Sequence, residues 1–381
     1  MKKSVADFQI FVKPVGSACN LACKYCYYLK TGEPNHENGV PRMKEALLEQ
    51  YILQHIEASP GPDIFFSWHG GEPTMAGLQY FQRLVEIQQK HLPEGCRIVN
   101  GLQTNGTMLD HDWCRFLADE HFMVGISIDG PEELHSLFRG SKEGNPTFVE
   151  TMRGYELLRS YGIQCEILCV VNAQNVEQPL RVYNFFKELK CEYLTFLPLV
   201  ERRSPGSNLA SERSVSSRAF GKFLCAIFDE WKAYDIGDII IQLFEEALRT
   251  AFDLEHTLCI FKVTCGGVPV VEHNGNFYSC DHYVNIDHLI GNIAQTHLVE
   301  MLESRRQEAF GMKKLDTLPD YCLACEVLDM CNGACPKDRF IQTPDGQPGL
   351  NYLCEGYRMF FNHCKPFVEE VAEVWRSGQV M

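Results

Sequence analysis

The first 200 residues alternate short apolar runs with longer segments of helical periodicity. Each apolar run has the length of a strand, and most end at a glycine, asparagine or proline that signals a turn. The apolar runs predict six strands, at residues 9–13, 63–68, 97–103, 122–128, 166–171 and 193–197. The periodic segments between them predict helices at residues 43–58, 77–91, 109–120, 147–161 and 177–189.

This alternation predicts a parallel sheet, because strands joined by helical crossovers run in the same direction. Six units are too few to close an eight-stranded barrel, so we expect an α/β fold with a partial (β/α)6 barrel of the TIM type. Ligand sites in such sheets lie at the carboxyl ends of the strands. Polar or glycine-rich signatures fall at four of these ends, at residues 19–26, 69–73, 103–106 and 127–130. We therefore expect a ligand site at this edge.

The pattern changes after residue 200. Residues 201–216 are rich in Ser, Arg, Pro and Gly and predict a loop, and residues 217–252 are mostly helical in pattern. From about residue 255 the chain becomes cysteine-dense and rich in turn residues, which predicts a small cysteine-rich α+β domain. The expected domains are the barrel at 1–235, the cysteine-rich domain at 236–365, and a C-terminal helix or tail at 366–381.

The composition and charge argue against nucleic-acid and membrane partners. The chain has 381 residues, 45% apolar and 22% charged, with a net charge of -15. Without a basic run, binding to nucleic acid is disfavoured. No apolar window is long enough for a membrane span, and the first residues lack the apolar core of a signal peptide, so we expect a cytoplasmic protein. Eighteen cysteines in that compartment indicate metal or redox chemistry rather than disulfides.

Three cysteines follow the first predicted strand in a C-x3-C-x2-C pattern: Cys19, Cys23 and Cys26. Their odd number prevents complete pairing among themselves, whereas three thiolates in one loop can bind one metal centre. An iron–sulfur cube is normally held by four thiolates. Three ligands would leave one iron open to a substrate or a cofactor.

Eight further cysteines lie between residues 259 and 354, which is enough for two four-thiolate sites: Cys259, Cys265, Cys280, Cys322, Cys325, Cys331, Cys335 and Cys354. Asn274-Gly275 predicts a hairpin that folds Cys280 back toward Cys265. Their spacing suits zinc and iron–sulfur centres equally. Because the N-terminal triplet has no obvious fourth protein ligand for zinc, iron–sulfur centres throughout are the simpler interpretation.

These motifs resemble known ones. The triplet, with Tyr25 before its last cysteine, resembles the signature of radical S-adenosylmethionine enzymes, and residues 70–73 (Gly-Gly-Glu-Pro) resemble their cofactor-binding motif. The second cysteine group resembles the SPASM extension, which carries two auxiliary [4Fe-4S] clusters. More narrowly, the chain resembles the anaerobic sulfatase-maturating enzymes, mainly through residues 278–284, which contain Cys280-Asp281.

The resemblance implies three [4Fe-4S] clusters and S-adenosylmethionine as cofactors. It assigns Cys19, Cys23 and Cys26 to the catalytic cluster. The first auxiliary cluster would be held by Cys259, Cys265, Cys280 and Cys335. The second would be held by Cys322, Cys325, Cys331 and Cys354. The implied contacts to S-adenosylmethionine are Tyr25, Gly71, Ser127, Arg139 and Val200.

The resemblance also implies a reaction. A 5′-deoxyadenosyl radical would remove hydrogen from Cβ of a Cys or Ser in an unfolded sulfatase polypeptide, and an auxiliary cluster would accept an electron. Asp281 would take the thiol or hydroxyl proton, and the product would be Cα-formylglycine. Tyr28 would line the substrate side, and His69 stands where some relatives have Gln. A flavodoxin or ferredoxin would supply electrons. Without the resemblance, the sequence favours a solvated or capping carboxylate near a turn for Asp281 over a base.

Two other functions fit parts of the pattern. Another SPASM enzyme, one that forms thioether crosslinks or epimerises residues in a peptide, would share the cluster motifs. A non-catalytic, cysteine-rich zinc protein would use only the second cysteine group. Metal content distinguishes the zinc protein from the enzyme. The mass change of a target peptide distinguishes another SPASM enzyme from a sulfatase-maturating one.

Overall fold

The computed structural model describes residues 3–5, 7–28 and 40–378, and the chain divides into two compact units. Unit 1 comprises Met1–Ser127, Ser136–Cys165 and Gly266–Gly311. Unit 2 comprises Ile128–His135, Glu166–Cys265 and Met312–Met381. The chain passes between the units several times, so neither is a continuous stretch of sequence.

The core of unit 1 is a mostly parallel sheet in the order β10-β9-β8-β1-β2-β3-β4. Its strands are β1 (Phe11–Val12), β2 (Asp63–Trp68), β3 (Arg97–Thr104), β4 (Met123–Ser127), β8 (Val270–Val271), β9 (Asn276–Tyr278) and β10 (Leu289–Asn292). The first four match strands predicted from the apolar runs, and they pair in parallel. Their carboxyl ends therefore share one edge, as predicted.

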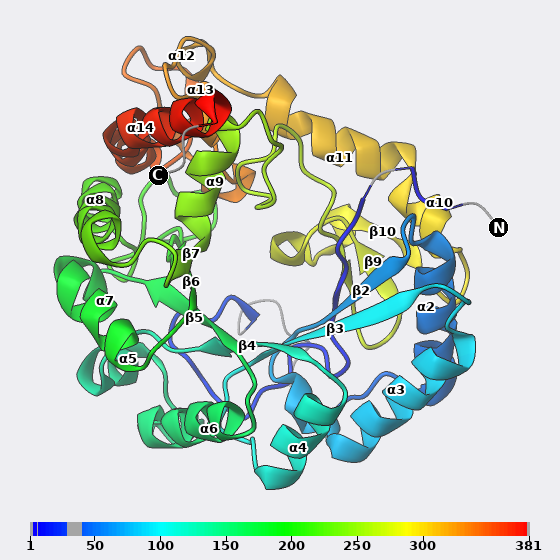
Figure 1. The fold of residues 1–381 in the computed structure, drawn as a ribbon. Helices are drawn as coiled ribbons and strands as arrows, with labels where there is room; N and C mark the ends of the chain where they lie inside the picture. The colour runs from blue at the N-terminus through cyan, green and yellow to red at the C-terminus, as the bar shows by residue number, and fades with distance from the viewer. Residues whose placement is uncertain (1–2, 6, 29–39, 379–381) are drawn as a thin grey trace. The chain divides into compact units, whose positions relative to one another are not determined.

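Amphipathic helices cover this sheet (Figure 1). They are α2 (Glu45–Ala58), α3 (Leu78–His91), α4 (His111–Asp119), α6 (Phe148–Ser160) and α10 (Leu298–Leu302). Asp110 caps α4 by accepting a hydrogen bond from the amide of Trp113 at 2.9 Å. Helix α2 buries Leu48, Ile52 and Ile56, which explains its apolar periodicity.

Residues 266–311 extend the sheet of unit 1 beyond β1. The predicted hairpin at Asn274-Gly275 is present, with β8 and β9 antiparallel and Gly275 at φ 84°, where glycine is favoured. Strand β8 also pairs in parallel with β1. The first part of the cysteine-rich region is thus built into the same sheet as the N-terminal cysteine loop.

Unit 2 contains the parallel strands β5 (Cys165–Val171, of which Cys165 belongs to unit 1), β6 (Tyr193–Pro198) and β7 (Ile240–Ile241). The prediction that residues 217–252 are mostly helical is confirmed, with one break at the centre. Helix α8 (Ser217–Tyr234) ends before Gly237, which has φ 89°, and α9 (Gln242–Ala251) begins after β7. Pairing of Ile240-Ile241 with β6 replaces helix there.

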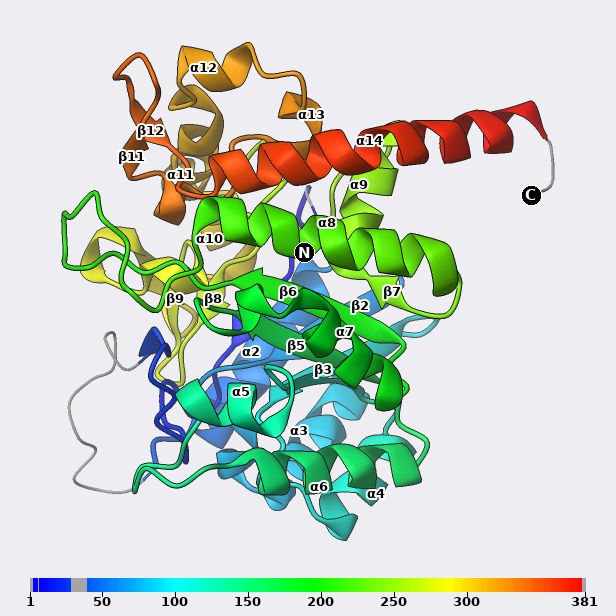
Figure 2. The ribbon, with the colours of Figure 1, turned by 90° about the vertical axis from the view of Figure 1, so that its left-hand side faces the viewer.

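The remaining elements of unit 2 are mostly short. They are α7 (Pro179–Glu188), α12 (Asp320–Leu323), α13 (Leu328–Cys331), β11 (Ile341–Gln342), β12 (Pro348–Leu350) and α14 (Cys354–Ser377). Helix α11 (Arg305–Asp316) and α5 (Glu132–Phe138) each span a boundary between the units. Helix α14 packs along α8 (Figure 2). The two backbones meet at Gly221 and Gly356, where a Cβ on Gly356 would lie 2.1 Å from the carbonyl oxygen of Ser217.

The expected fold class is confirmed as an α/β fold with a mostly parallel sheet. Across residues 3–5, 7–28 and 40–378, no helix combines the length and the apolar character that crossing a membrane requires.

Candidate active site

The N-terminal cysteine loop is held on one side by the glycine motif after β2. The amide of Gly71 donates to the carbonyl of Gly16 at 3.0 Å, and that of Glu72 donates to the carbonyl of Ala18 at 2.8 Å. A Cβ on Gly71 would lie 2.1 Å from the carbonyl oxygen of Ala18. Only glycine permits this approach, so Gly71 sets the path of the chain into Cys19.

On its other side, the cysteine loop pairs with residues 138–141. The amides of Ala22 and Lys24 donate to the carbonyls of Gly140 and Phe138 at 2.9 and 2.8 Å. Arg139 Nη1 donates to the hydroxyl of Tyr25 at 2.9 Å, and both side chains are buried. Two residues that the resemblance assigned to cofactor contact therefore lie together beside the predicted cluster ligands.

The other two predicted cofactor contacts lie at the ends of strands. Ser127 closes β4, and its hydroxyl accepts a hydrogen bond from Gln103 Nε2 at 3.2 Å. Val200 belongs to unit 2, where it follows β6 and is buried. Both positions agree with the expectation that ligand-binding residues follow parallel strands.

Asn105 supports the cysteine loop, and the sequence did not single it out as a residue. Its Nδ2 lies 3.8 Å from Cys19 Sγ and donates to Asn20 Oδ1 at 3.0 Å. The amide of Leu21 also donates to Cys19 Sγ, at 3.3 Å. Asn105 falls within the predicted signature at residues 103–106, but that pattern gave no reason to expect a contact between Asn105 and Cys19. Hydrogen bonds to a ligating sulfur tune the potential of a cluster.

Glu72 braces the same region. Its buried carboxylate accepts hydrogen bonds from the backbone amide and the hydroxyl of Thr74, from the hydroxyl of Thr104 and from the amide of Asn105, at 2.7 to 3.1 Å. Burial still raises the pKa of Glu72, although these hydrogen bonds oppose it. The ends of β2 and β3 are thereby tied together.

Each predicted set of ligand cysteines contains thiols that are close neighbours. Burial raises the pKa of Cys19 to about 12, and the charges of Glu72, Cys23 and Cys26 add to the effect. In unit 2, Cys322, Cys325, Cys331 and Cys354 line one cavity. Burial raises the pKa of Cys331 to about 12, with further contributions from Cys354, Cys322 and Cys325.

Cys259, Cys265 and Cys335 also form a neighbouring group within unit 2. Burial raises the pKa of Cys335 to about 11, with contributions from Asp338 and, more weakly, Cys259. The pKa of Cys265 is likewise raised by burial, and Cys335 contributes. Cys280, the fourth predicted ligand of this group, belongs to unit 1.

This donor set fits iron–sulfur clusters better than single metal ions. Within the part of the chain that the structure describes, no three His, Cys, Asp or Glu side chains close on one ion. The ligands of a four-iron cube stand farther apart than those of one zinc ion, because the cube itself is larger. The predicted ligand thiols are neighbours and mostly half-buried, and their separation matches the wider spacing that a cube requires.

Asp281 forms a second centre in unit 1, beside Lys13. The Lys13 ammonium lies 2.6 Å from Asp281 Oδ1 and 2.9 Å from Glu272 Oε1, and Lys13 is 1% exposed. The hydroxyl of Tyr28 donates to Asp281 Oδ2 at 2.7 Å, and that of Tyr27 donates to the same oxygen. Lys13 comes from the end of β1 and Asp281 follows β9, so the pairing of β8 with β1 brings them together.

The electrostatics of this centre keep Asp281 ionised. Burial raises the pKa of Asp281, but the charges of Lys13 and His282 and the hydrogen bonds from Lys13 and Tyr27 outweigh it, so the pKa falls to about 2. Burial lowers the pKa of His69 to about 4, so its imidazole is neutral. That ring stacks on Phe11 with centroids 3.9 Å apart.

Comparison with protein-family models matches residues 14–186 to the radical SAM superfamily. Residues 265–326 match the iron–sulfur cluster-binding domain SPASM. The first matched region contains the cysteine loop and the glycine motif after β2, and the second contains Cys280 and Asp281.

Individual relatives match over nearly the whole chain. A serine-type anaerobic sulfatase-maturating enzyme of Bacteroides thetaiotaomicron is 44% identical over 373 residues, covering 94% of this chain and 90% of the relative. A cysteine-type anaerobic sulfatase-maturating enzyme of Clostridium perfringens is 33% identical over 369 residues, covering 95% and 98%. The solved structure of native anSMEcpe with bound AdoMet and Cp18Cys peptide has a TM-score of 0.85 at 33% identity, covering 97% and 99% of the two chains.

Proposed function

The chain belongs to the family of anaerobic sulfatase-maturating enzymes, and we propose that it oxidises a Cys or Ser side chain of an unfolded sulfatase polypeptide to Cα-formylglycine. The observation that supports this most directly is the buried carboxylate of Asp281, which follows the predicted ligand Cys280 and contacts Lys13, Tyr27 and Tyr28. Relatives of both the serine and the cysteine type match, so both side chains remain in the proposal.

The proposed cofactors are three [4Fe-4S] clusters and S-adenosylmethionine. When bound, they supply abstraction of a hydrogen atom from an unactivated carbon and an acceptor for one electron. Cys19, Cys23 and Cys26 would hold the catalytic cluster, and the eight later cysteines would hold the two auxiliary clusters in the sets predicted above. Tyr25, Gly71, Ser127, Arg139 and Val200 would contact S-adenosylmethionine.

Asp281 is the proposed base. Conversion of the side chain to an aldehyde removes two electrons and two protons, and Asp281 would take the proton carried by sulfur or oxygen. With Cys, water then replaces the sulfur, which leaves as hydrogen sulfide. Among the described residues, the two tyrosine hydroxyls donate to Oδ2, and Lys13 is the ion-pair partner of Oδ1. Oδ1 is therefore the oxygen that we assign to a substrate thiol or hydroxyl.

We infer that electrons come from a small donor such as a flavodoxin or ferredoxin, and that the reaction occurs in the cytoplasm, where reducing conditions keep thiols available for iron. Eleven proposed ligand thiols among eighteen cysteines support a reducing compartment. The net charge of -15 gives no support for a nucleic-acid partner.

The test replaces Asp281 with Asn, which keeps the size of the side chain but removes the base. Under anaerobic reconstitution, Asp281→Asn should bind about twelve irons, the content of three four-iron clusters, and should still release 5′-deoxyadenosine. Formylglycine in a Cys or Ser peptide, read by mass, should fall by about 10²- to 10⁴-fold, the usual contribution of a general base.

The matched control is Asp287→Asn, at an exposed carboxylate six residues away, which should match the wild-type enzyme. Wild-type formylglycine yields from Asp281→Asn would show that another group is the base. A thioether crosslink or an epimerised residue in the peptide would replace the proposed reaction with that of another SPASM maturase. Zinc in place of iron would end the enzymatic proposal.

A further inference from the structure

Three consecutive residues between Cys331 and Cys335 have left-handed backbone conformations. Asn332, Gly333 and Ala334 have φ angles of 47°, 68° and 48°. Glycine accepts this region readily, but Asn does so less often and Ala rarely. Such a run persists only when surrounding contacts enforce it. We refer to residues 332–334 as the left-handed turn.

Arg339 supplies the contacts that hold the left-handed turn. Its Nε donates to the carbonyl of Gly333 at 2.9 Å, and its Nη2 donates to those of Asn332 and Ala334 at 3.0 and 3.5 Å. Its Nη1 donates to the carbonyl of Lys314 at 2.6 Å. A Cβ on Gly333 would lie 2.5 Å from Arg339 Nη2, so the guanidinium sits against the turn itself. A planar group with five donors suits this task, and lysine does not reproduce it.

The left-handed turn directs two cysteines into different ligand sets. Cys331, before the turn, is a neighbour of Cys354, Cys322 and Cys325. Cys335, after the turn, is a neighbour of Cys259 and Cys265. The direction of the chain through residues 332–334 therefore decides how both sets assemble.

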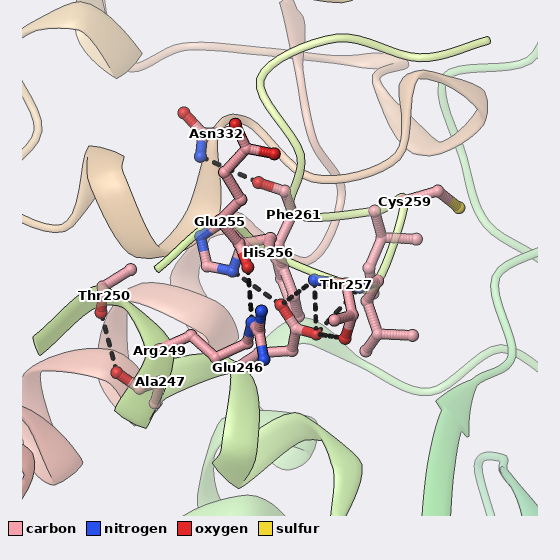
Figure 3. Close-up of polar contacts among 12 residues, drawn as sticks. Glu246, Ala247, Arg249, Thr250, Glu255, His256, Thr257, Cys259, Phe261 and Asn332 are labelled. Carbon is pink, nitrogen blue, oxygen red and sulfur yellow. Dashed lines mark hydrogen bonds and ion pairs between the residues drawn. The ribbon is translucent and has the colours of Figure 1, made fainter. Parts of the chain in front are cut away.

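The same turn is tied to the segment that carries Cys259 (Figure 3). Asn332 Nδ2 donates to the carbonyl of Phe261 at 2.8 Å, and Lys314 Nζ donates to the carbonyls of Cys259 and Ile260 at 3.0 and 2.8 Å. The beginning of this segment is anchored by Glu246, a buried residue of α9. Its carboxylate accepts hydrogen bonds from the amides of Thr257 and Leu258 and from the ring of His256.

Arg339 is also the cation that the two sets share. It interacts electrostatically with Cys322 and Cys331 of one set and with Cys265 and Cys335 of the other. Lys314, which is fully buried, interacts most strongly with Cys265, Cys335 and Cys259, which all belong to one of the two sets. Arg339 therefore acts on cysteines of both sets, whereas the strongest interactions of Lys314 are with one set. Variants of the two residues can measure this difference.

We propose that Arg339 is a positioning and redox-tuning residue common to both auxiliary sites: it holds the left-handed turn and sets one positive charge beside both groups of cysteines. This inference rests on the proposed auxiliary clusters. A nearby positive charge stabilises the reduced form of a cluster, which carries the more negative charge, and so raises its reduction potential. Loss of Arg339 should lower the potentials of both auxiliary clusters together.

The test compares Arg339→Gln, Arg339→Lys and Lys314→Gln in the fully reconstituted enzyme, by iron content and by redox titration followed with electron paramagnetic resonance. Arg339→Gln should shift both auxiliary potentials to more negative values and leave the N-terminal cluster unchanged. Arg339→Lys keeps the charge and should shift both by less. Lys314→Gln should shift only the first auxiliary cluster, the one assigned to Cys259, Cys265, Cys280 and Cys335. Arg376→Gln, at an exposed arginine near the end of α14, should shift none.

Unchanged auxiliary potentials in an iron-replete Arg339→Gln enzyme, or a shift of only one, would overturn the proposal. If Arg339→Gln loses the iron of both auxiliary sites, the positioning role is supported, and Lys314→Gln then decides whether charge sets the potential. An effect of Lys314→Gln on both clusters, or on neither, would contradict the charge argument. Wild-type protein with far fewer than about twelve irons would instead count against the proposed clusters themselves.

Discussion

Gly71 has a steric task in the structure that its predicted contact with S-adenosylmethionine does not include. The resemblance assigned it to contact with S-adenosylmethionine. The structure adds a steric requirement, because its Cα faces the backbone of Ser17 and Ala18, and a Cβ would lie 2.5 and 2.1 Å from their carbonyl oxygens. At distances this short there is no room for a methyl group. Gly71 therefore shapes the loop that carries the cysteines, whatever else it contacts.

We predict that Gly71→Ala loses the N-terminal cluster. The added methyl group must push residues 17 and 18 away, and Cys19 moves with them. Iron content after anaerobic reconstitution should fall by about four per chain, while the auxiliary clusters remain. Gly61→Ala, where the nearest atom to a new Cβ is 3.9 Å away, is the matched control and should keep all the iron. Full iron in Gly71→Ala, with weaker binding of S-adenosylmethionine, would favour a contact role alone.

The residues that sequence analysis identified are those that carry a recognisable local motif. Cys19, Tyr25 and Gly71 lie in short patterns, and Asp281 adjoins a cysteine. Lys13, by contrast, is a single lysine at the end of a strand, and its importance comes from Asp281, 268 positions away in the sequence. Arg339 likewise acts through backbone carbonyls that no side-chain pattern reveals. Such contacts depend on how the chain folds and leave no local pattern in the sequence, so they were not predictable.

At the scale of elements, apolar periodicity predicted most of the parallel strands and the helices between them. It could not predict the break in residues 217–252, because Ile240 and Ile241 continue the apolar pattern although they pair with β6. It also gave no reason to place β8 beside β1, since two-residue strands have no period. Tertiary pairing decides such short elements.

The buried face of α2 makes a prediction about pH. His55 is 1% exposed, its ring stacks on Phe66 with centroids 4.3 Å apart, and the hydroxyl of Tyr51 lies 2.8 Å from its Nδ1. Burial lowers the pKa of His55 to about 3. The unfolded chain, in which a histidine has its ordinary pKa near 6.5, then binds more protons between about pH 3 and 6.5. Stability contributed by this residue is therefore lost as the pH falls through that window.

Lowering the pH from 7.5 to 5.5 should cost the wild-type protein about 1.4 kcal/mol of unfolding free energy through His55 alone. His55→Gln keeps an acceptor for Tyr51 but does not titrate, so its loss over the same interval should be smaller by that amount. Denaturation midpoints of both proteins at the two pH values, measured anaerobically, give the difference. An equal loss in both would mean that the ring is already charged in the native state.

For the whole molecule, the two units differ in what orders the segments that carry cysteines. In unit 1 the cysteine loop is paired with residues 138–141 and with the glycine motif through backbone hydrogen bonds. In unit 2, residues 320–354 form only short elements, of which α12 and α13 have four residues each. Helices this short are not stable by themselves. Where local structure is weak, binding of metal supplies the folding free energy.

Removal of iron should therefore loosen the molecule unevenly. We predict that chelation of the clusters under reducing conditions speeds amide hydrogen exchange in residues 320–335 by at least about tenfold, the effect of losing about 1.4 kcal/mol of local stability. Residues 63–68 and 97–102, paired along β2 and β3, should keep their protection. The cysteine loop of unit 1 should respond less than residues 320–335, because its backbone partners remain. Uniform acceleration would indicate that the whole chain unfolds without metal, and no change in residues 320–335 would show that protein contacts order this segment.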